Sequence, residues 1–253
     1  MRPLLFLLLC LPAFAQQLPD LYTQETHGDP PFLYQSGWKP LLNGRDLSGW
    51  QSISGKPHAW ITTPAVTWRR IFDPKRLNFT PGPGDRIVNG RDGVTLDLST
   101  IDKFGDCELY LDYMLAQGSN SGVFLNGEYE IQLFDSFGHQ GVLQPGDNGG
   151  IYRLHDGTGG WPPSANVSRP PGAWQSLHVY FRAPRFENGR KTQNARFLRV
   201  FLNETLIHQN VELSGPTGSR RNIEEVPAGP IVFQGDHGPV AYRNIYVRPA
   251  TFQ

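Results

Sequence analysis

Residues 118–138 read GSNSGVFLNGEYEIQLFDSFG, and this stretch decides the fold. The Asn-Gly pair at residues 126–127 separates two runs of strand-forming residues. Such a pair predicts a β-hairpin with a two-residue type I′ turn, because both central positions need a positive φ. In the register that this turn sets, Val123 lies opposite Glu130 and Phe124 lies opposite Tyr129. One face of the hairpin is therefore expected to be apolar, and the other to carry acids and amides.

The polar face of this hairpin differs from an ordinary wet sheet face, on which Lys, Thr and Arg are expected. Here Glu128, Glu130 and Gln132 follow one another, and Asp135 comes just beyond them. A row of acids and amides favours the binding of polyhydroxylated ligands. A solvated face that carries a few acids is the alternative interpretation.

Length and charge bound the class of protein. The chain has 253 residues, of which 38% are hydrophobic, and its formal net charge is +0. This length suffices for one sizeable core, and β-sandwiches of this size commonly form a single domain. The balanced charge gives no electrostatic argument for nucleic acid or an anionic membrane as partner. A small neutral ligand, such as a carbohydrate, becomes the expected partner.

The first residues are typical of a secretory signal: a positive residue, an apolar run and an A-x-A cleavage site at residues 13–15. The apolar run is shorter than the roughly 20 residues of a membrane span. We therefore expect cleavage before Gln16, a periplasmic or secreted protein, and no integral membrane segment in the mature chain. Lipoprotein-type cleavage at Cys10 is disfavoured. The remaining cysteine, Cys107, is expected to be a small apolar core residue.

Period-two alternation of apolar and polar residues recurs along the rest of the chain, at residues 94–98, 107–115, 174–182 and 240–247. A second hairpin is expected about Asn203-Glu204. No long window has helical periodicity. These patterns predict an all-β, antiparallel two-sheet sandwich of the jelly-roll type. We assign residues 16–37 to a leader or strap and residues 38–253 to a single jelly-roll domain.

The segment 137–169 is a long loop region rich in Gly, Asp and Asn. Loops of this length in a compact domain are usually functional or disordered, and the aromatics Tyr152 and Trp161 favour function, as sugar-stacking faces. Two other tryptophans are expected to be structural: Trp50 as an anchor against the body, and Trp174 as a core residue.

Five stretches in succession resemble signatures of the 3-keto-disaccharide hydrolase domain family, over nearly all of the mature chain. They are WKPLLNGRDLSGW, SNSGVFLNGEYEIQLFDSFG, RPPGAWQSLHVYFRAPRFENGR, VFLNETLIHQNVELSGPT and GPIVFQGDHGPVAYRNIYVRP. The resemblance implies a concanavalin-like jelly roll, export, and action on glycosides whose ring carries a ketone at carbon 3. One departure is visible. Family members often read Gln-Asp-His-Gly near the end, whereas here Gly235 stands between Gln234 and Asp236.

Glu130, Gln132 and Asp135 form E-x-Q-x-x-D, which is similar to the E-x-D-x-x-E strand of laminarinase-type glycosidases. Those enzymes use two carboxylates about 5 to 9.5 Å apart. A flat strand would separate Glu130 from Asp135 by about 16 Å and put them on opposite faces, so only a bulge near residues 133–134 would bring them together. Gln132 also replaces an acid of that pattern, which weakens an ordinary double-displacement mechanism.

A 3-keto sugar requires a smaller set of groups, because its ketone acidifies the hydrogen on carbon 2. One base, one oxyanion stabiliser and one acid suffice for elimination, after which water adds back. We predict Glu130 as the base, His237 as the acid with Asp236 beside it, and Asp135 as a further catalytic partner. The remaining candidates would hold hydroxyls or the enolate oxygen: Asn120, Gln132 and Gln234.

No cofactor is expected. Glu130, Asp135 and His237 are metal-ligand types, so a divalent metal stays an alternative, although no tight ligand spacing supports it. Two other functions also stay open: a non-catalytic carbohydrate-binding module of lectin type, and an ordinary laminarinase-type glycoside hydrolase.

Overall fold

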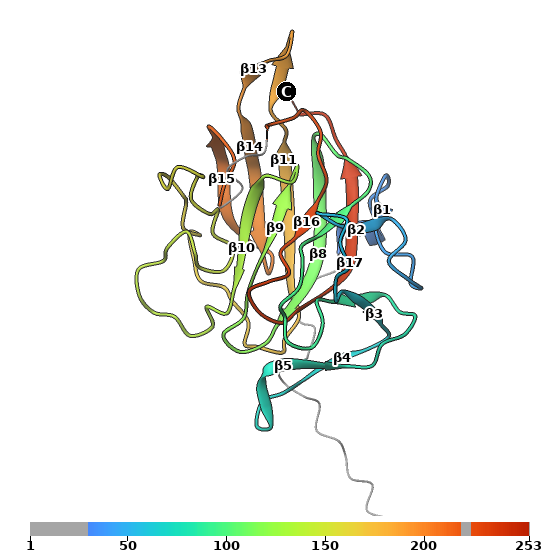
Figure 1. Cartoon of the computed structure of the whole chain (residues 1–253). Helices are drawn as coiled ribbons and strands as arrows, with labels where there is room; N and C mark the ends of the chain where they lie inside the picture. The colour runs from blue at the N-terminus through green and yellow to red at the C-terminus, as the bar shows by residue number, and fades with distance from the viewer. Residues whose placement is uncertain (1–29, 219–223, 253) are drawn as a thin grey trace, which may run out of the picture.

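The computed structural model of this protein describes residues 30–218 and 224–252. The predicted signal segment and Cys10 lie outside these residues. The described part contains two β-sheets that lie face to face, and every strand pair in them is antiparallel (Figure 1). Its one helical element is a short 3-10 helix, Pro31–Leu33, and no described helix has the length and hydropathy to cross a bilayer. The predicted all-β sandwich is confirmed.

The larger sheet has eight strands in the order β15, β14, β11, β8, β17, β6, β3, and β1 pairs with β17 as well. Their bounds are β1 Lys39–Pro40, β3 Ile61–Thr63, β6 Arg86–Val88, β8 Cys107–Leu115, β11 Gln175–Arg182, β14 Ala195–Leu202, β15 Thr205–Leu213 and β17 Val240–Pro249. The smaller sheet has five strands in the order β10, β9, β16, β7, β2. Their bounds are β2 Trp50–Ser52, β7 Leu98–Thr100, β9 Asn120–Leu125, β10 Tyr129–Phe134 and β16 Val232–Phe233.

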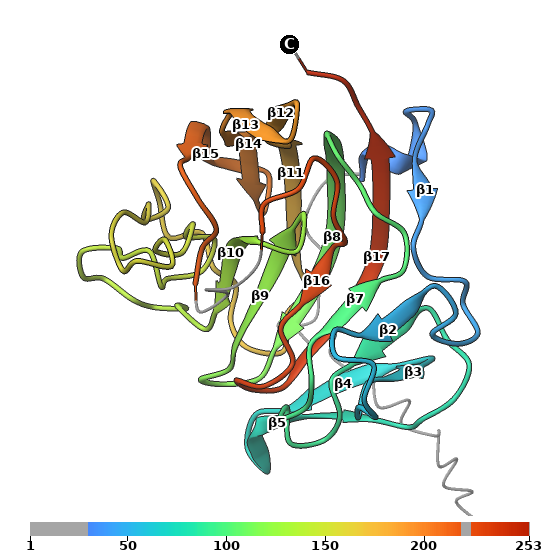
Figure 2. The same ribbon diagram turned by 45° about the horizontal axis from the view of Figure 1, so that its top comes forward.

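Two separate hairpins flank the sandwich, as Figure 2 shows from a second direction. They are β4 (Val66–Arg69) with β5 (Asp73–Phe79), and β12 (Arg185–Glu187) with β13 (Arg190–Gln193). The predicted turn at Asn203-Glu204 joins β14 to β15, and both of its residues have a positive φ.

The core between the two sheets follows from the alternation in the sequence. On β8 the apolar face that begins at Cys107 points inward, and on β10 Tyr129, Ile131 and Leu133 do the same; all of them are buried in one cluster. Cys107 is 1% exposed, and burial raises the pKa of its thiol to about 12, as expected for an inert core residue. Trp50 also joins this core, and its indole donates to the carbonyl oxygen of Leu41 at 2.8 Å.

A second, smaller apolar cluster lies on the outer face of the larger sheet. Met114 and Ala241 project to this side, where Val66 and Leu77 of the β4–β5 hairpin cover them together with Trp174. The hairpin is thus packed onto the sandwich by its base. Elsewhere on the outer face, the ring of Phe32 stacks on that of Tyr246, with the ring centroids 3.8 Å apart.

The predicted register of the central hairpin is wrong by one residue. The ladder pairs Tyr129 with Leu125 and Glu130 with Phe124, so three residues, 126–128, connect the strands. The Asn-Gly turn itself forms, since Asn126 and Gly127 both have a positive φ. Glu128 leaves the ladder because its carbonyl oxygen accepts hydrogen bonds from the backbone N–H and the hydroxyl of Thr217, a residue far away in the sequence.

A second correction concerns residues 94–98. They were expected to form a strand, but β7 begins only at Leu98. The carbonyl oxygens of Thr95 and Leu96 lie close to Gly235, and the indole of Trp60 donates a hydrogen bond to the carbonyl oxygen of Leu96. This segment therefore contacts other loops and does not pair with a strand.

Candidate active site

The outward face of the smaller sheet carries polar residues in ordered rows. Because Glu130 pairs with Phe124, and Phe124 with Val232, these three side chains share one row across β10, β9 and β16. The next row holds Gln132 and Gly122, which are paired, and then Gln234, whose backbone N–H donates to the carbonyl oxygen of Gly122 at 2.9 Å. Two of the predicted amides therefore flank a glycine beside the predicted base.

The carboxylate of Glu130 lies between two glycines. A Cβ atom on Gly122 would sit 2.3 Å from its Oε1, and one on Gly218 would sit 3.0 Å from its Oε2. Any side chain at Gly122 would therefore displace the carboxylate. The backbone of Glu130 is fixed as well, because its N–H donates to the hydroxyl of Thr217 at 2.7 Å. With 4% of Glu130 exposed, the carboxylate is held in one place and largely shielded from water.

The predicted amides lie next to this carboxylate on the same face. Gln132 donates through Nε2 to Oδ1 of Asn120 at 2.6 Å, so these two side chains form one unit. On the other side of Gly122, the Oε1 of Gln234 is buried and accepts no hydrogen bond from the described residues. A buried acceptor without a donor needs an explanation, and a sugar hydroxyl would satisfy it.

The two aromatics of the long loop have different placements. Residues 149–152 run along the free edge of β10, where Ile151 bridges to Ile131 and the N–H of Tyr152 donates to the carbonyl oxygen of Glu130. Tyr152 therefore shares the face of Glu130, and it is 37% exposed. Trp161 bridges to Ile151 and packs against the inner core. Tyr152 is thus at the site, whereas Trp161 mainly supports it.

The loop before Tyr152 is held by buried hydrogen bonds. Asn148 accepts from the hydroxyl of Tyr113 at 2.8 Å, and Asp147 accepts from that of Ser136 at 2.8 Å. Burial lowers the pKa of His208, and its Nε2 lies 2.7 Å from the carbonyl oxygen of Gly149, so the neutral ring donates there. These contacts give the Gly-rich loop a defined conformation along the edge of β10.

Asp135 does not join Glu130. The ladder between β10 and β9 runs from Tyr129 to Phe134 without a shift, so the bulge that would bring the two carboxylates together is absent from this described hairpin. Asp135 instead accepts from the N–H of Gly118 through Oδ2 at 2.8 Å, and its own N–H donates to the carbonyl oxygen of Ser119. It supports the turn that leads into β9.

Asp236 and His237 lie at the rim of the same face. The side chain of Asp236 contacts Nδ1 of His237, and both side chains are about half exposed, at 51% and 53%. The carbonyl oxygen of His237 accepts from the N–H of Asn120 at 3.2 Å, which places this pair at the Asn120 end of the site.

Three residues of this face were not identified by the sequence analysis. Asp97 precedes β7 and accepts from the N–H of Gly235 at 2.9 Å, one strand beyond Gln234. Thr217 and Gly218 meet Glu130 from the far end of the chain. No local pattern marks them, because each acts through a partner more than 80 residues away.

Among residues 30–218 and 224–252, no three His, Cys, Asp or Glu side chains gather as a metal-ion site. The three ligand types named from the sequence are therefore dispersed: Glu130 on the sheet, Asp135 at a turn and His237 at the rim.

Comparisons with known proteins give a consistent result. The family model of the 3-keto-alpha-glucoside-1,2-lyase-like domain matches residues 37–248. A crystal structure of a "putative glycosyl hydrolase" from Parabacteroides distasonis superposes with a TM-score of 0.62 at 26% identity, over 85% of this chain and 84% of that one.

A second structure described in the same words, from the same organism, has a TM-score of 0.57 at 18% identity and covers 85% of this chain and 95% of its own. At that identity it supports the fold alone. No curated protein matches this chain.

Proposed function

Because this chain belongs to the 3-keto-alpha-glucoside-1,2-lyase-like domain family, we propose that it cleaves 3-keto-glycosides or 3-keto-disaccharides by base-catalysed elimination followed by hydration. The coarser assignment, a glycoside-cleaving enzyme with a sugar substrate, is supported by the family and by the structural relative at 26% identity. The observation that carries the finer proposal is the carboxylate of Glu130, which is held between Gly122 and Gly218 beside a row of amides.

The proposed reaction begins at carbon 2 of the keto sugar. The carboxylate of Glu130 removes the hydrogen from carbon 2, and the electron pair moves toward the ketone to form an enolate. Amide N–H groups of Gln132, Asn120 or Gln234 stabilise the enolate oxygen. The bond between carbon 1 and the leaving oxygen then breaks, and a double bond forms between carbons 1 and 2.

The leaving oxygen needs a proton, for which we propose His237. Asp236 contacts Nδ1 of His237, which leaves Nε2 as the ring nitrogen that can serve the leaving oxygen. Water then adds across the new double bond, with hydroxyl going to carbon 1 and hydrogen to carbon 2. The net result is hydrolysis, and Tyr152 offers a ring on which the sugar can stack.

An ordinary laminarinase-type mechanism is less well supported. It needs two carboxylates on one site, and Asp135 binds the N–H of Gly118 instead of approaching Glu130. A non-catalytic lectin-like module would need the amide row but not a carboxylate fixed by two glycines.

The test compares an oxidised disaccharide with its parent in deuterated water. We expect cleavage of the 3-keto substrate, little cleavage of the parent, and exchange of the carbon 2 hydrogen with solvent. Equal rates on both sugars without exchange would support the ordinary glycosidase. Binding of both without cleavage would support the module.

We also propose that the reaction needs no cofactor, because deprotonation beside a ketone can be completed by the residues described above. Turnover should then be unchanged after dialysis against a chelator. A loss of activity that added Mg²⁺, Mn²⁺ or Zn²⁺ restores would contradict this.

Export to the periplasm or beyond is proposed from the leader sequence, which lies outside the described residues. N-terminal sequencing of exported protein should find Gln16 as the first residue. A retained Met1 or a lipidated Cys10 would refute this proposal.

A further inference from the structure

The β4–β5 hairpin projects from the sandwich and carries the most exposed large apolar side chains among the described residues. Ile71 is 85% exposed and Phe72 is 84% exposed, and the two are neighbours at the hairpin tip. Isolated exposed apolar residues are common on protein surfaces, but an adjacent aliphatic and aromatic pair at a projecting tip suggests an interaction site.

Basic residues surround this tip. Arg69 and Arg70 precede it, Lys75 and Arg76 follow it, and all four are exposed. The only acid between them is Asp73, which lies 3.7 Å from Arg76. A chain with zero net charge thus concentrates a net positive charge at one projecting hairpin.

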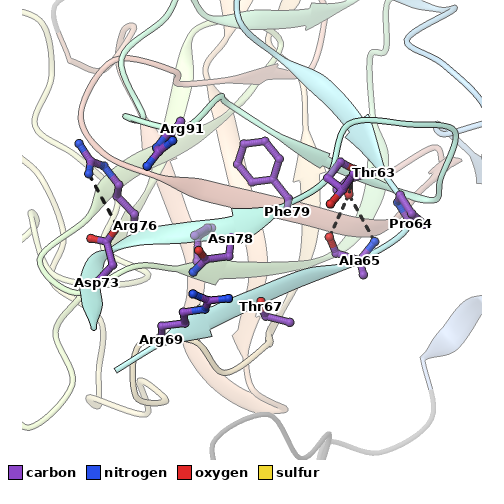
Figure 3. A pocket seen from close by; sticks show the side chains of 12 residues that line it. Thr63, Pro64, Ala65, Thr67, Arg69, Asp73, Arg76, Asn78, Phe79 and Arg91 are labelled. Atoms are coloured by element: carbon purple, nitrogen blue, oxygen red, sulfur yellow. Dashed lines mark hydrogen bonds and ion pairs between the residues drawn. The ribbon is translucent and has the colours of Figure 1, made fainter. Parts of the chain in front are cut away.

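A polar groove of about 670 Å³ runs along the hairpin, from Thr63 and Phe79 at its base to Arg69 and Asp73 beside its tip, and Figure 3 shows its lining residues. Arg69, Arg76 and Arg91 line it, and Arg76 also pairs with Asp92 at 3.0 Å. Asn78 lies between them, and its Nδ2 is buried without an acceptor among the described residues. The groove therefore offers cationic groups, which suit a phosphate oxygen.

The hairpin is also anchored to the sandwich close to its tip, so the tip is presented in a fixed direction. The indole of Trp68 packs against Gly172, where a Cβ atom would lie 2.5 Å from the ring, and its Nε1 donates to the carbonyl oxygen of Pro74 at 2.8 Å. The same carbonyl oxygen accepts from the N–H of Gln117 at 2.9 Å. The tip can insert without the hairpin having to fold on binding.

We propose that this hairpin docks the protein onto the surface of an anionic phospholipid bilayer. Ile71 and Phe72 enter the boundary between headgroups and acyl chains, while Arg69, Arg70, Lys75 and Arg76 contact headgroup phosphates. A soluble polyanion could satisfy the arginines but would leave the apolar pair in water. The apolar pair therefore favours a lipid surface, and the proposal does not depend on the reaction that the enzyme catalyses.

The test uses the exported chain and vesicles of phosphatidylglycerol with phosphatidylcholine, compared with vesicles of phosphatidylcholine alone. We expect co-sedimentation with the anionic vesicles only, and weaker binding as NaCl is raised, because salt screens exposed charges. Equal binding to both kinds of vesicle, or binding to neither, would overturn the proposal.

Variants separate the two parts of the docking surface. Ile71→Ser with Phe72→Ser should weaken binding at least about tenfold, because the apolar contact is lost. Arg69→Gln with Arg70→Gln should weaken it by about 25-fold, since each cation near an anionic surface contributes about fivefold. The matched control is Val142→Ser, which removes a side chain of 82% exposure from a segment, residues 140–144, that has no Lys or Arg. Binding that is unaffected by the tip variant would overturn the proposal, as would tighter binding to a soluble polyanion such as heparin.

Discussion

At the scale of single residues, the position of the Glu130 carboxylate depends on the absence of a side chain at Gly122. They lie on neighbouring strands, and the carboxylate occupies the space that a side chain at position 122 would take. This arrangement holds the carboxylate of the proposed base in one place. It leads to two predictions about turnover.

Glu130→Gln should lower kcat by about 10²- to 10⁴-fold, the usual contribution of a general base. The substitution keeps the shape of the side chain, so thermal melting should change little. Asp135→Asn is the matched control and should retain most activity, because Asp135 caps the Gly118 turn. Full activity of Glu130→Gln would refute the role of Glu130 as base and favour His237 instead.

Gly122→Ala should also abolish most turnover, because the new methyl group would stand 2.3 Å from Oε1 of Glu130 and force the carboxylate away. Gly122 does not have a positive φ, so the effect is steric and not a backbone strain. Gly82→Ala is the control, since its Cβ would meet only Pro64, at 4.0 Å. The test measures kcat and the thermal melting curve of both variants. Equal activity would show that the carboxylate can reposition.

At the scale of elements, the edge segment 149–152 determines which aromatic reaches the site. It pairs with β10 on one side and with Trp161 on the other, so Tyr152 points outward and Trp161 toward the core. From the sequence, both aromatics were predicted to lie at the site. The sequence does not show that residues 149–152 lie along the edge of β10 like an additional strand.

Substitution of the two aromatics should therefore have separable effects. Tyr152→Ala should raise KM about threefold to tenfold through the loss of stacking, with stability nearly unchanged. Trp161→Ala should lower the free energy of unfolding by about 2 kcal/mol, since it removes a partly buried core contact. Steady-state kinetics and urea unfolding measure the two effects. A large stability loss in Tyr152→Ala would contradict the assignment.

At the scale of the whole molecule, Asp106 forms hydrogen bonds that connect three parts of the chain. Its carboxylate accepts from both terminal nitrogens of Arg185, at 2.6 and 2.7 Å, and from the backbone N–H groups of Ala183 and Phe252. Burial by itself would raise the pKa of Asp106, but these hydrogen bonds outweigh it and hold the pKa below the ordinary value of 3.8.

A carboxyl group whose pKa is lowered by folding stabilises the fold at pH values above its pKa in the unfolded chain. This contribution is lost as the pH falls through its pKa in the folded protein. Asp106→Asn should therefore lower the free energy of unfolding by about 2 kcal/mol at pH 7. The difference from the wild type should shrink below about pH 3.8. Asp102→Asn, at an exposed position of the same loop, should change little at any pH. Urea unfolding at pH 7, 5 and 3 provides the measurement. A difference between wild type and Asp106→Asn that does not depend on pH would contradict the role of the charge.

The local sequence determined the strands and the direction in which their side chains point. Alternation at residues 107–115 and 129–133 marks the faces that line the core between the sheets, because consecutive side chains of an extended backbone must project to opposite sides. The Asn-Gly turn was predictable for a similar reason, since few residues accept a positive φ. Glu130 and Gln132 were therefore correctly placed on one face without knowledge of the tertiary structure.

Only the tertiary structure decided what surrounds them. Thr217 withdraws Glu128 from the ladder and shifts the register by one residue, and β16 inserts beside β9 and brings Gln234 next to Gly122. Asp135 stays apart from Glu130 because nothing forces a bulge into β10. Each of these outcomes depends on pairing between segments far apart in the chain. Local propensity cannot encode such pairing, since it is settled by which surfaces fit when the two sheets close on their common core.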